Sequence, residues 1–278
     1  MKEQFVEEYL QYGVRLHKDI VFGNADGTAL KLDLLVSREP RREPSPVIVW
    51  VHGGGWCNHD LDRNYRPELE LLRFVSRGYI VASIDYRLSD QVPFPAQIQD
   101  CKCAIRYLRA NAEKWNLDPD RIGVWGESAG GHLVDLLGAA EDVPEFEGSG
   151  GWQGYSSRVS AVCTWYSPAD LTGTAIAQDD GTVNLLVGNP APDKLPEALR
   201  FASPVTYLHP GMPPFLVMHG NADELVPFAQ SEELFRRLRE LGCPAEFYAV
   251  DGQGHGFFQG DEPYRVIHDF FDKYLLVR

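Results

Sequence analysis

The chain is poor in cysteine and in basic residues, and it has no long hydrophobic run. Its five cysteines include no Cys-x-x-Cys pair, so neither a disulfide framework nor a metal site is indicated. Only 26 Lys and Arg stand against 40 Asp and Glu, and the net charge of -14 disfavours nucleic acid and anionic membranes as partners. No stretch approaches the roughly 18 consecutive apolar residues of a membrane-spanning helix. The N-terminal stretch MKEQFVEEYLQYG lacks the apolar core of a signal peptide, so we expect a cytoplasmic location.

Short apolar segments alternate with segments of helical periodicity along the 278 residues. Buried strands are predicted over 47–51, 79–84, 122–125, 159–165, 215–218 and 247–250. Residues 15–22 and 30–37 favour an antiparallel hairpin across GNADGT. Strands that alternate with helices indicate a mostly parallel sheet covered on both faces. We therefore predict a single α/β domain, 1–278, with a central sheet of about eight strands.

Residues 121–140, RIGVWGESAGGHLVDLLGAA, combine a strand, a serine between glycines and a helix. The pattern from Gly126 to Gly130 is Gly-x-Ser-x-Gly, which in this context is typical of a nucleophile elbow. The turn is tight enough to require small flanking residues, and it lifts the hydroxyl of Ser128 above the sheet. There the free N–H groups of a helix N-terminus favour developing negative charge. We predict that Ser128 is a nucleophile.

A serine nucleophile needs a base, and His255 lies between two glycines after the last predicted strand. The base needs a carboxylate to hold its tautomer, and Asp223 follows the preceding strand in HGNADELVP. The chain order Ser128, Asp223, His255 is the order expected of an α/β-hydrolase. Asp170, in WYSPADL, is the rival for the acid because it also follows a strand. We favour Asp223, since acid and base then lie at the ends of consecutive strands.

The stretch VWVHGGGWCNHD places three glycines directly after a predicted buried strand. Consecutive glycines are costly to order, so a strand end that carries them indicates a close backbone approach. A tetrahedral intermediate needs N–H donors aimed at its oxyanion from a second loop, and HGGG-type loops provide them. We predict that Gly54 and Gly55, with Ala129 after the nucleophile, form an oxyanion hole. Trp56 is expected to wall the acyl pocket.

The motifs HGGGW, DPDRIGVWGESAGGHL, HGNADELVP and GQGHGF together resemble α/β-hydrolase esterases near the hormone-sensitive-lipase group. Within that group they are similar to bacterial esterases of the feruloyl and acetylxylan type. The resemblance implies a serine carboxylesterase that uses an acyl-enzyme, needs no cofactor, and acts on short-acyl or aryl esters of small molecules or oligosaccharides. Two positions depart from the family pattern. Cys57 follows the glycine loop, and Asp135, if buried in the helix after the elbow, must find a partner or be protonated.

Residues 166–212 connect two predicted strands and are much longer than a usual loop. We expect two short helices there and a small lid or pocket wall over Ser128. The segment carries a polar set ill suited to an oil surface: Asp179, Asp180, Asn184, Asp193, Lys194, Glu197 and Arg200. Trp165 and Tyr166, at a strand end, are expected to form a flat aromatic slot with Trp56.

Two other functions remain open from the sequence. An amidase is one, because kynurenine formamidases share an HGG-x-W loop. A binding protein on an inactive hydrolase scaffold is the other, and the intact serine, histidine and aspartate argue against it. The sequence is compatible with a homo-oligomer and does not fix the oligomeric state.

Overall fold

A computed structural model describes residues 6–39, 41–173 and 181–276. Its strands form one nine-stranded sheet in the order β1-β2-β3-β5-β4-β6-β7-β8-β9. The strands are β1 (Val6–Tyr9), β2 (Val14–Ala25), β3 (Thr28–Ser37), β4 (Ser45–Val51), β5 (Ile80–Ile84), β6 (Leu117–Glu127), β7 (Ala161–Trp165), β8 (Phe215–Gly220) and β9 (Ala245–Val250).

The sheet is parallel from β5 to β9 and antiparallel at the β1 edge. The predicted hairpin is confirmed as β2 and β3, which pair antiparallel. The ninth strand is β1, a four-residue edge strand that the sequence pattern did not predict. Short edge strands carry little hydrophobic alternation, so period-two patterning misses them easily.

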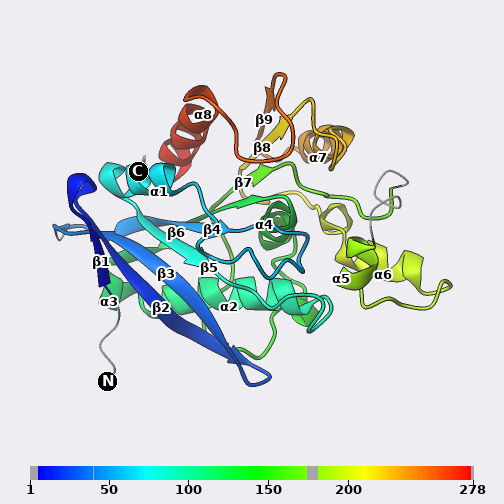
Figure 1. Ribbon diagram of the computed structural model, residues 1–278, viewed down its shortest axis with the longest axis horizontal. Helices are drawn as coiled ribbons and strands as arrows, with labels where there is room; N and C mark the ends of the chain where they lie inside the picture. The colour runs from blue at the N-terminus through cyan, green and yellow to red at the C-terminus, as the bar shows by residue number, and fades with distance from the viewer. Residues whose placement is uncertain (1–5, 40, 174–180, 277–278) are drawn as a thin grey trace.

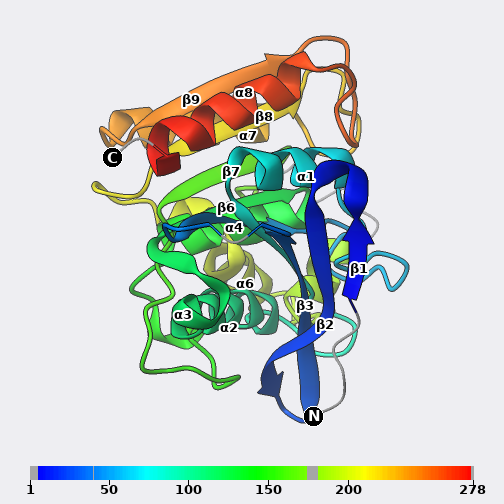
Figure 2. The ribbon, with the colours of Figure 1, turned by 90° about the vertical axis from the view of Figure 1, so that its left-hand side faces the viewer.

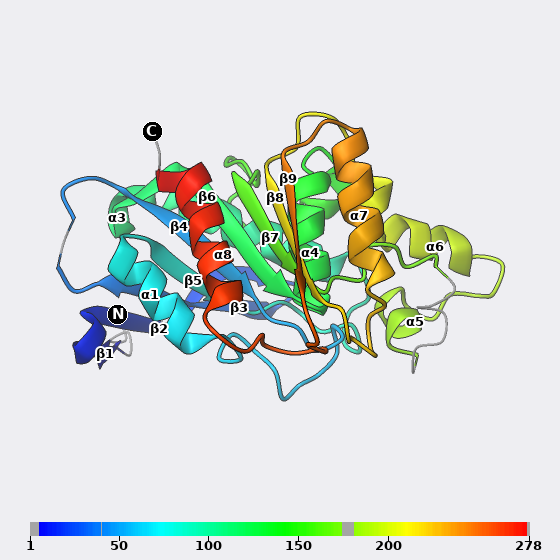
Figure 3. The same ribbon diagram turned by 90° about the horizontal axis from the view of Figure 1, so that it is seen from above.

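Helices cover both faces of the sheet (Figures 1 and 2). The α-helices of the described residues are α1 (Glu68–Arg77), α2 (Ala96–Ala110), α3 (Ala112–Trp115), α4 (Ala129–Ala139), α5 (Thr182–Leu186), α6 (Leu195–Ala202), α7 (Ala229–Glu240) and α8 (Glu262–Phe271). Helices α1 and α8 lie side by side over one face (Figure 3), where Phe74 of α1 packs on Phe271 of α8. Helices α2, α4 and α7 pack on the opposite face, as their buried residues share one core cluster with that side of the sheet.

Strand β4 shows why the central strands are apolar throughout. All seven of its residues are buried. Val47, Val49 and Val51 face the core under α2 and α4, whereas Ile48 and Trp50 face the core under α1 and α8. A parallel strand covered on both faces needs apolar residues at every position rather than at alternate ones. Chemistry must therefore lie beyond the strand ends.

The carboxyl ends of the parallel strands lie at one edge of the sheet, and four of them carry the predicted catalytic residues and the glycine loop. The glycine loop follows β4, Ser128 follows β6, Asp223 follows β8 and His255 follows β9. In the register of the sheet, Val51 pairs with Gly126 and Gly220 pairs with Val250. This alignment brings segments far apart in the sequence to neighbouring positions, as expected for sites in α/β sheets.

The segment 166–212 leaves the carboxyl end of β7, and in its described part it carries the short α-helices α5 and α6, in agreement with the two short helices predicted there. Figures 1 and 3 show both helices together at one end of the molecule, beyond α4. We call residues 166–212 the insertion. Within the described residues, every helix is too short or too polar to cross a bilayer.

Candidate active site

Ser128 occupies a sharp turn between the last residue of β6 and the first residue of α4. Its backbone has φ 53° and ψ -119°, a left-handed conformation that costs energy for a residue with a side chain. A Cβ at Gly126 would lie 2.4 Å from the carbonyl oxygen of Gly130, and one at Gly130 would lie 2.1 Å from that of Val51. Only glycine fits at both positions. The close packing of the turn explains the Gly-x-Ser-x-Gly spacing.

The structure brings Ser128, His255 and Asp223 together in one hydrogen-bonded chain. His255 Nε2 lies 3.0 Å from Ser128 Oγ, and His255 Nδ1 lies 2.8 Å from Asp223 Oδ2. A carboxylate only accepts, so Nδ1 carries the proton and Nε2 is free to accept the serine proton. The Asp223 side chain is fully buried, while that of His255 is 19% exposed. This is the arrangement that general-base activation of a serine requires.

Asp223 is held as an anion by several donors. Burial by itself would raise the pKa of Asp223, but hydrogen bonds from His219 and His255, the charge of His255 and the Val226 N–H outweigh it. The pKa of Asp223 is therefore well below its usual range. The backbone N–H groups of Leu225 and Val226 donate to its other oxygen at 2.8 and 2.9 Å. An ionised carboxylate in this position can stabilise an imidazolium on His255, which is what the predicted role of Asp223 requires.

His219 is a second histidine on this aspartate, and the sequence reasoning missed it. Its Nε2 lies 3.1 Å from both Asp223 Oδ2 and the carbonyl oxygen of Val226, so Nε2 carries the proton. Its Nδ1 accepts from the Ser231 hydroxyl at 2.8 Å. His219 is the penultimate residue of β8, four positions before Asp223. A histidine four positions before the predicted acid, at the end of the same strand, was the sequence feature that could have indicated this contact.

The rival acid, Asp170, is not near the histidine. One of its oxygens accepts from the N–H and hydroxyl of Thr172, at 3.0 and 2.6 Å. The other lies 3.9 Å from Arg237. Asp170 therefore fixes its own loop against α7.

The glycine loop after β4 has a continuous left-handed backbone at Gly54, Gly55 and Trp56, with φ of 103°, 55° and 60°. The N–H of Gly53 is already used, because it donates to Glu127 Oε1 at 2.9 Å. Among the residues that the structure describes, none accepts from the N–H groups of Gly54 and Gly55. Ala129 is the first residue of α4, where no helical acceptor is available. These three N–H groups are the free donors of the predicted oxyanion hole.

Glu127 connects the parts of the site, and the sequence reasoning did not single it out. One oxygen accepts from Gly53 and the other accepts from the Tyr166 hydroxyl at 2.7 Å. The Tyr166 ring in turn lies 4.4 Å from the imidazole of His255. Burial raises the pKa of Glu127, while the Tyr166 hydroxyl, the charge of His255 and the Gly53 N–H oppose that rise. In the sequence, a glutamate directly before the predicted nucleophile could have indicated a buried carboxyl group that needs hydrogen-bond donors.

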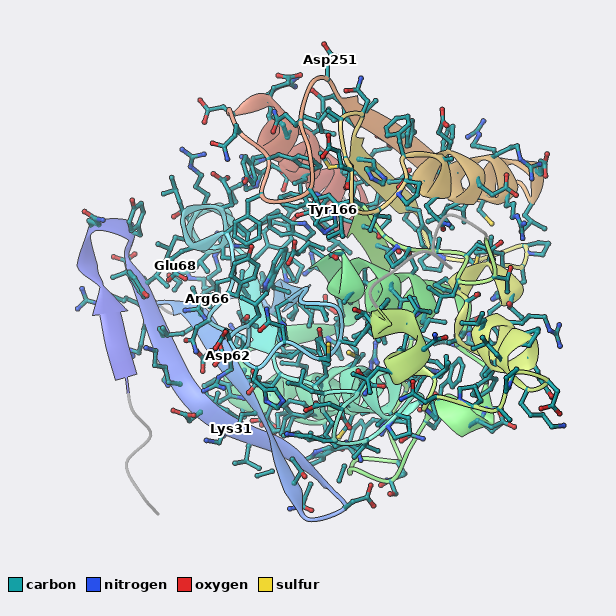
Figure 4. All side chains as sticks on the ribbon, turned by 45° about the vertical axis from the view of Figure 1, so that its right-hand side comes forward. Lys31, Asp62, Arg66, Glu68, Tyr166 and Asp251 are labelled. Atoms are coloured by element: carbon teal, nitrogen blue, oxygen red, sulfur yellow. The ribbon has the colours of Figure 1, made fainter. Side chains whose placement is uncertain are left out.

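The structure corrects the predicted aromatic slot. Trp165 is completely buried and packs against Trp50 and Trp125, on the face of the sheet covered by α1 and α8. Tyr166, labelled in Figure 4 beyond the end of β7, is also completely buried and hydrogen-bonded to Glu127. Trp56 is 3% exposed and packs against His132. None of the three offers an open ring face to a substrate, because each is fixed in the packing that supports the site.

The two departures from the family pattern lie close to this site. Cys57 is half-buried, and its N–H donates to the carbonyl of Gly54 at 3.2 Å. Asp135 is buried on α4, and neither of its oxygens has a hydrogen-bond partner among the described residues. Burial raises the pKa of Asp135 to about 7. Of the two outcomes expected for a buried Asp135, protonation is the one that the geometry favours.

A family model named BD-FAE matches residues 32–238 of the chain. Esterase LipC of Mycobacterium tuberculosis is 33% identical over 236 residues, which are 84% of this chain and 58% of LipC. The chain spans about half the length of the curated relatives it matches, with 58%, 50% and 47% of the first three covered.

Two solved structures are similar over almost the whole chain. A truncated carbohydrate esterase from gut microbiota is 28% identical, with a TM-score of 0.82 and 99% of both chains covered. A bifunctional GH43-CE protein of Bacteroides eggerthii is 31% identical, with a TM-score of 0.85, over 96% of this chain and 39% of that one. The family model matches most of the length of the chain, and the fold superposes on that of a solved carbohydrate esterase. The chain therefore belongs to the BD-FAE family of α/β-hydrolase esterases.

Proposed function

We propose that the chain is a serine carboxylesterase that hydrolyses short-acyl esters, acetyl esters above all, on carbohydrates. One observation carries the proposal, namely the hydrogen-bonded chain from Ser128 Oγ through His255 to the buried Asp223. The free N–H groups of the glycine loop beside it support acyl transfer in particular, since a tetrahedral oxyanion needs such donors.

The proposed reaction proceeds in two halves. His255 Nε2 takes the proton of Ser128 as its oxygen attacks the ester carbonyl, and the oxyanion accepts from Gly54, Gly55 and Ala129. The imidazolium then gives its proton to the leaving alcohol, and the acyl group remains on Ser128. A water molecule, deprotonated by the same nitrogen, attacks the acyl-enzyme, and the imidazolium returns the proton to Ser128 Oγ as the bond to the acyl group breaks and the acid leaves. Asp223 stays ionised throughout and keeps the imidazole oriented.

The preference for a short acyl group rests on the surroundings of the glycine loop. A Cβ at Gly55 would lie 2.8 Å from the methyl group of Thr182, so the start of α5 lies directly against this loop. The predicted polar residues of the insertion that the structure describes include Asp193, which is exposed. Asp179 and Asp180 lie outside the described residues. Thr182 at the loop and the exposed Asp193 are polar residues, whereas a long acyl chain needs an extended apolar surface, because each methylene contributes about 0.8 kcal/mol only when it is buried.

The carbohydrate part of the proposal rests on relatives. A carbohydrate esterase superposes along 99% of this chain, and a bifunctional GH43-CE protein superposes along 96% of it. The corrected positions of Trp165 and Tyr166 remove the flat slot that would have favoured a feruloyl group. An acetyl group needs no such slot.

The proposal is tested with a substrate panel. Purified protein is assayed on p-nitrophenyl acetate, acetylated xylo-oligosaccharides, methyl ferulate and N-formylkynurenine, with Ser128→Ala as the control. We expect turnover of the first two that disappears in the variant. Preferred turnover of methyl ferulate would contradict the acyl preference. Preferred turnover of N-formylkynurenine would indicate an amidase, and no turnover of any substrate would contradict the hydrolase itself.

A further inference from the structure

His132 is a completely buried histidine close to the proposed active site that the reaction itself does not use. It lies on α4 one helical turn after the nucleophile, and its backbone N–H donates to the carbonyl of Ser128 at 2.9 Å. Its imidazole contacts two other parts of the chain. Nδ1 lies 3.3 Å from the indole nitrogen of Trp56, and Nε2 lies 2.7 Å from the carbonyl oxygen of Ala202. The glycine loop, the elbow helix and the insertion therefore meet at this one side chain.

The two contacts fix the tautomer of His132. The Ala202 carbonyl can only accept, so Nε2 must carry the proton. The indole N–H of Trp56 can only donate, so Nδ1 must be the bare acceptor. Burial lowers the pKa of His132 to about 4, and the ring is therefore neutral at neutral pH, as both contacts require. Ala202 is the last residue of α6, so a carbonyl group of the insertion fixes the tautomer in which the nitrogen that faces Trp56 is the acceptor.

The backbone of Trp56 is strained, and its hydrogen bond to His132 helps to hold it in that conformation. Trp56 has a left-handed backbone with φ 60°, which is uncommon and strained for a bulky residue. Its indole is buried and meets the ring of His132 edge-on, with centroids 5.1 Å apart. The two residues before it, Gly54 and Gly55, carry the free N–H groups of the loop. Because the peptide planes of consecutive residues are linked, the conformation of Trp56 sets the direction of the Gly55 end of the loop.

We propose that His132 is a positioning residue that aims the oxyanion donors by holding Trp56 in its left-handed conformation, with Ala202 of the insertion fixing the required tautomer. This inference rests on the proposed esterase function and adds a role that the hydrogen-bonded serine, histidine and aspartate do not reveal. His132 touches neither the substrate nor the reacting atoms. It acts on the transition state, where the oxyanion exists, more than on substrate binding.

The test measures kcat and KM for p-nitrophenyl acetate in matched variants. Trp56→Phe keeps an aromatic ring at this position and removes the N–H donor together with the five-membered ring that carries it. His132→Leu removes the acceptor, whereas His132→Asn places an amide oxygen near the position of Nδ1. His268→Leu is the control, because His268 is a buried histidine on α8, where it contacts Glu70 on the far face of the sheet. Inactivation by a p-nitrophenyl phosphonate, whose adduct mimics the tetrahedral oxyanion, is measured alongside.

We expect Trp56→Phe and His132→Leu each to lower kcat about tenfold, with KM changed less than about twofold. The double variant should lose no more than the worse single variant, since both remove one interaction. His132→Asn should keep kcat within about threefold of the wild type, and phosphonate inactivation should slow in step with kcat. His268→Leu should lower the melting temperature without lowering kcat.

Wild-type kcat in folded Trp56→Phe would overturn the inference while leaving the esterase function intact. Equal losses in kcat for His132→Leu and His268→Leu, in proportion to their melting temperatures, would also overturn it by showing a merely structural role. If His132→Leu does not fold, Trp56→Phe and His132→Asn decide the question. A wild-type protein without hydrolysis would refute the proposed function and this inference together.

Discussion

Replacing Asp135 by asparagine should stabilise the protein, and by an amount that depends on pH. Asp135 is 1% exposed on α4, and its oxygens lack hydrogen-bond partners among the described residues. Burial raises its pKa from 3.8 to about 7, and the nearby hydroxyls of Ser167 and Thr164, which form no hydrogen bond of good geometry with it, oppose the rise only in part. The folded protein therefore keeps a proton on Asp135 that the unfolded chain has already lost above pH 4.

The magnitude follows from the difference between the two pKa values. Between about pH 4 and pH 7 the folded state binds more protons than the unfolded state, so this residue makes stability fall as pH rises. Each pH unit in that window costs about 1.4 kcal/mol, so above pH 7 the total reaches roughly 4 kcal/mol. An asparagine side chain has nearly the same shape and cannot ionise, so the variant lacks this pH-dependent term. Its advantage over the wild type should grow by roughly 2.5 kcal/mol from pH 5 to pH 8.

Urea unfolding followed by tryptophan fluorescence, at pH 5, 6, 7 and 8, measures this difference. Asp60→Asn is the matched control, because it makes the same chemical change at an exposed position on the loop after β4. An advantage of Asp135→Asn that stays constant within about 0.5 kcal/mol across this range would refute the reasoning. It would show that Asp135 is ionised in the folded protein and that an unseen partner compensates its charge.

Three further outcomes are expected. Asp223→Asn should lower kcat on the order of 10⁴-fold, because the correct histidine tautomer is lost, whereas Asp170→Asn should lower it far less. Steady-state kinetics of both variants measures this, and the reverse ranking would show that Asp170 is the acid. Dialysis against EDTA should leave turnover unchanged, and a loss restored by added metal would contradict the proposed mechanism. Across p-nitrophenyl esters, kcat/KM should peak at about two to four acyl carbons, because burial of further methylenes stops; a profile still rising at about ten carbons would indicate an apolar trough for long chains.

Local sequence was sufficient to place the main residues of the site. A Cβ at Gly126 or Gly130 would collide with backbone atoms, so the turn at Ser128 requires glycine at both positions. The Gly-x-Ser-x-Gly motif therefore indicates this tight turn directly. Asp223 and His255 follow successive apolar strands, and parallel strands bring their carboxyl ends to one edge. The choice of Asp223 over Asp170 depended on this topology, and the hydrogen bonds to His255 agree with it.

The misplaced residues show where local sequence was insufficient. Trp165 ends a strand near the nucleophile, but strand periodicity turns its side chain toward the face covered by α8 rather than toward the edge. The bond between Glu127 and Gly53 joins residues 74 positions apart, and the bond between His132 and Ala202 joins residues 70 positions apart. No pattern within one segment reports such pairs.

The sequence alone therefore determined the fold class and the turn that presents Ser128, because both follow from periodicity and from positions that only glycine can occupy. The tertiary structure decided which backbone N–H groups of the glycine loop stay free, since that depends on Glu127 taking the one from Gly53. It also decided that Trp56 and Tyr166 support the site instead of lining it. Each of these outcomes depends on a partner that the chain supplies from a distant segment, and only folding brings the two together.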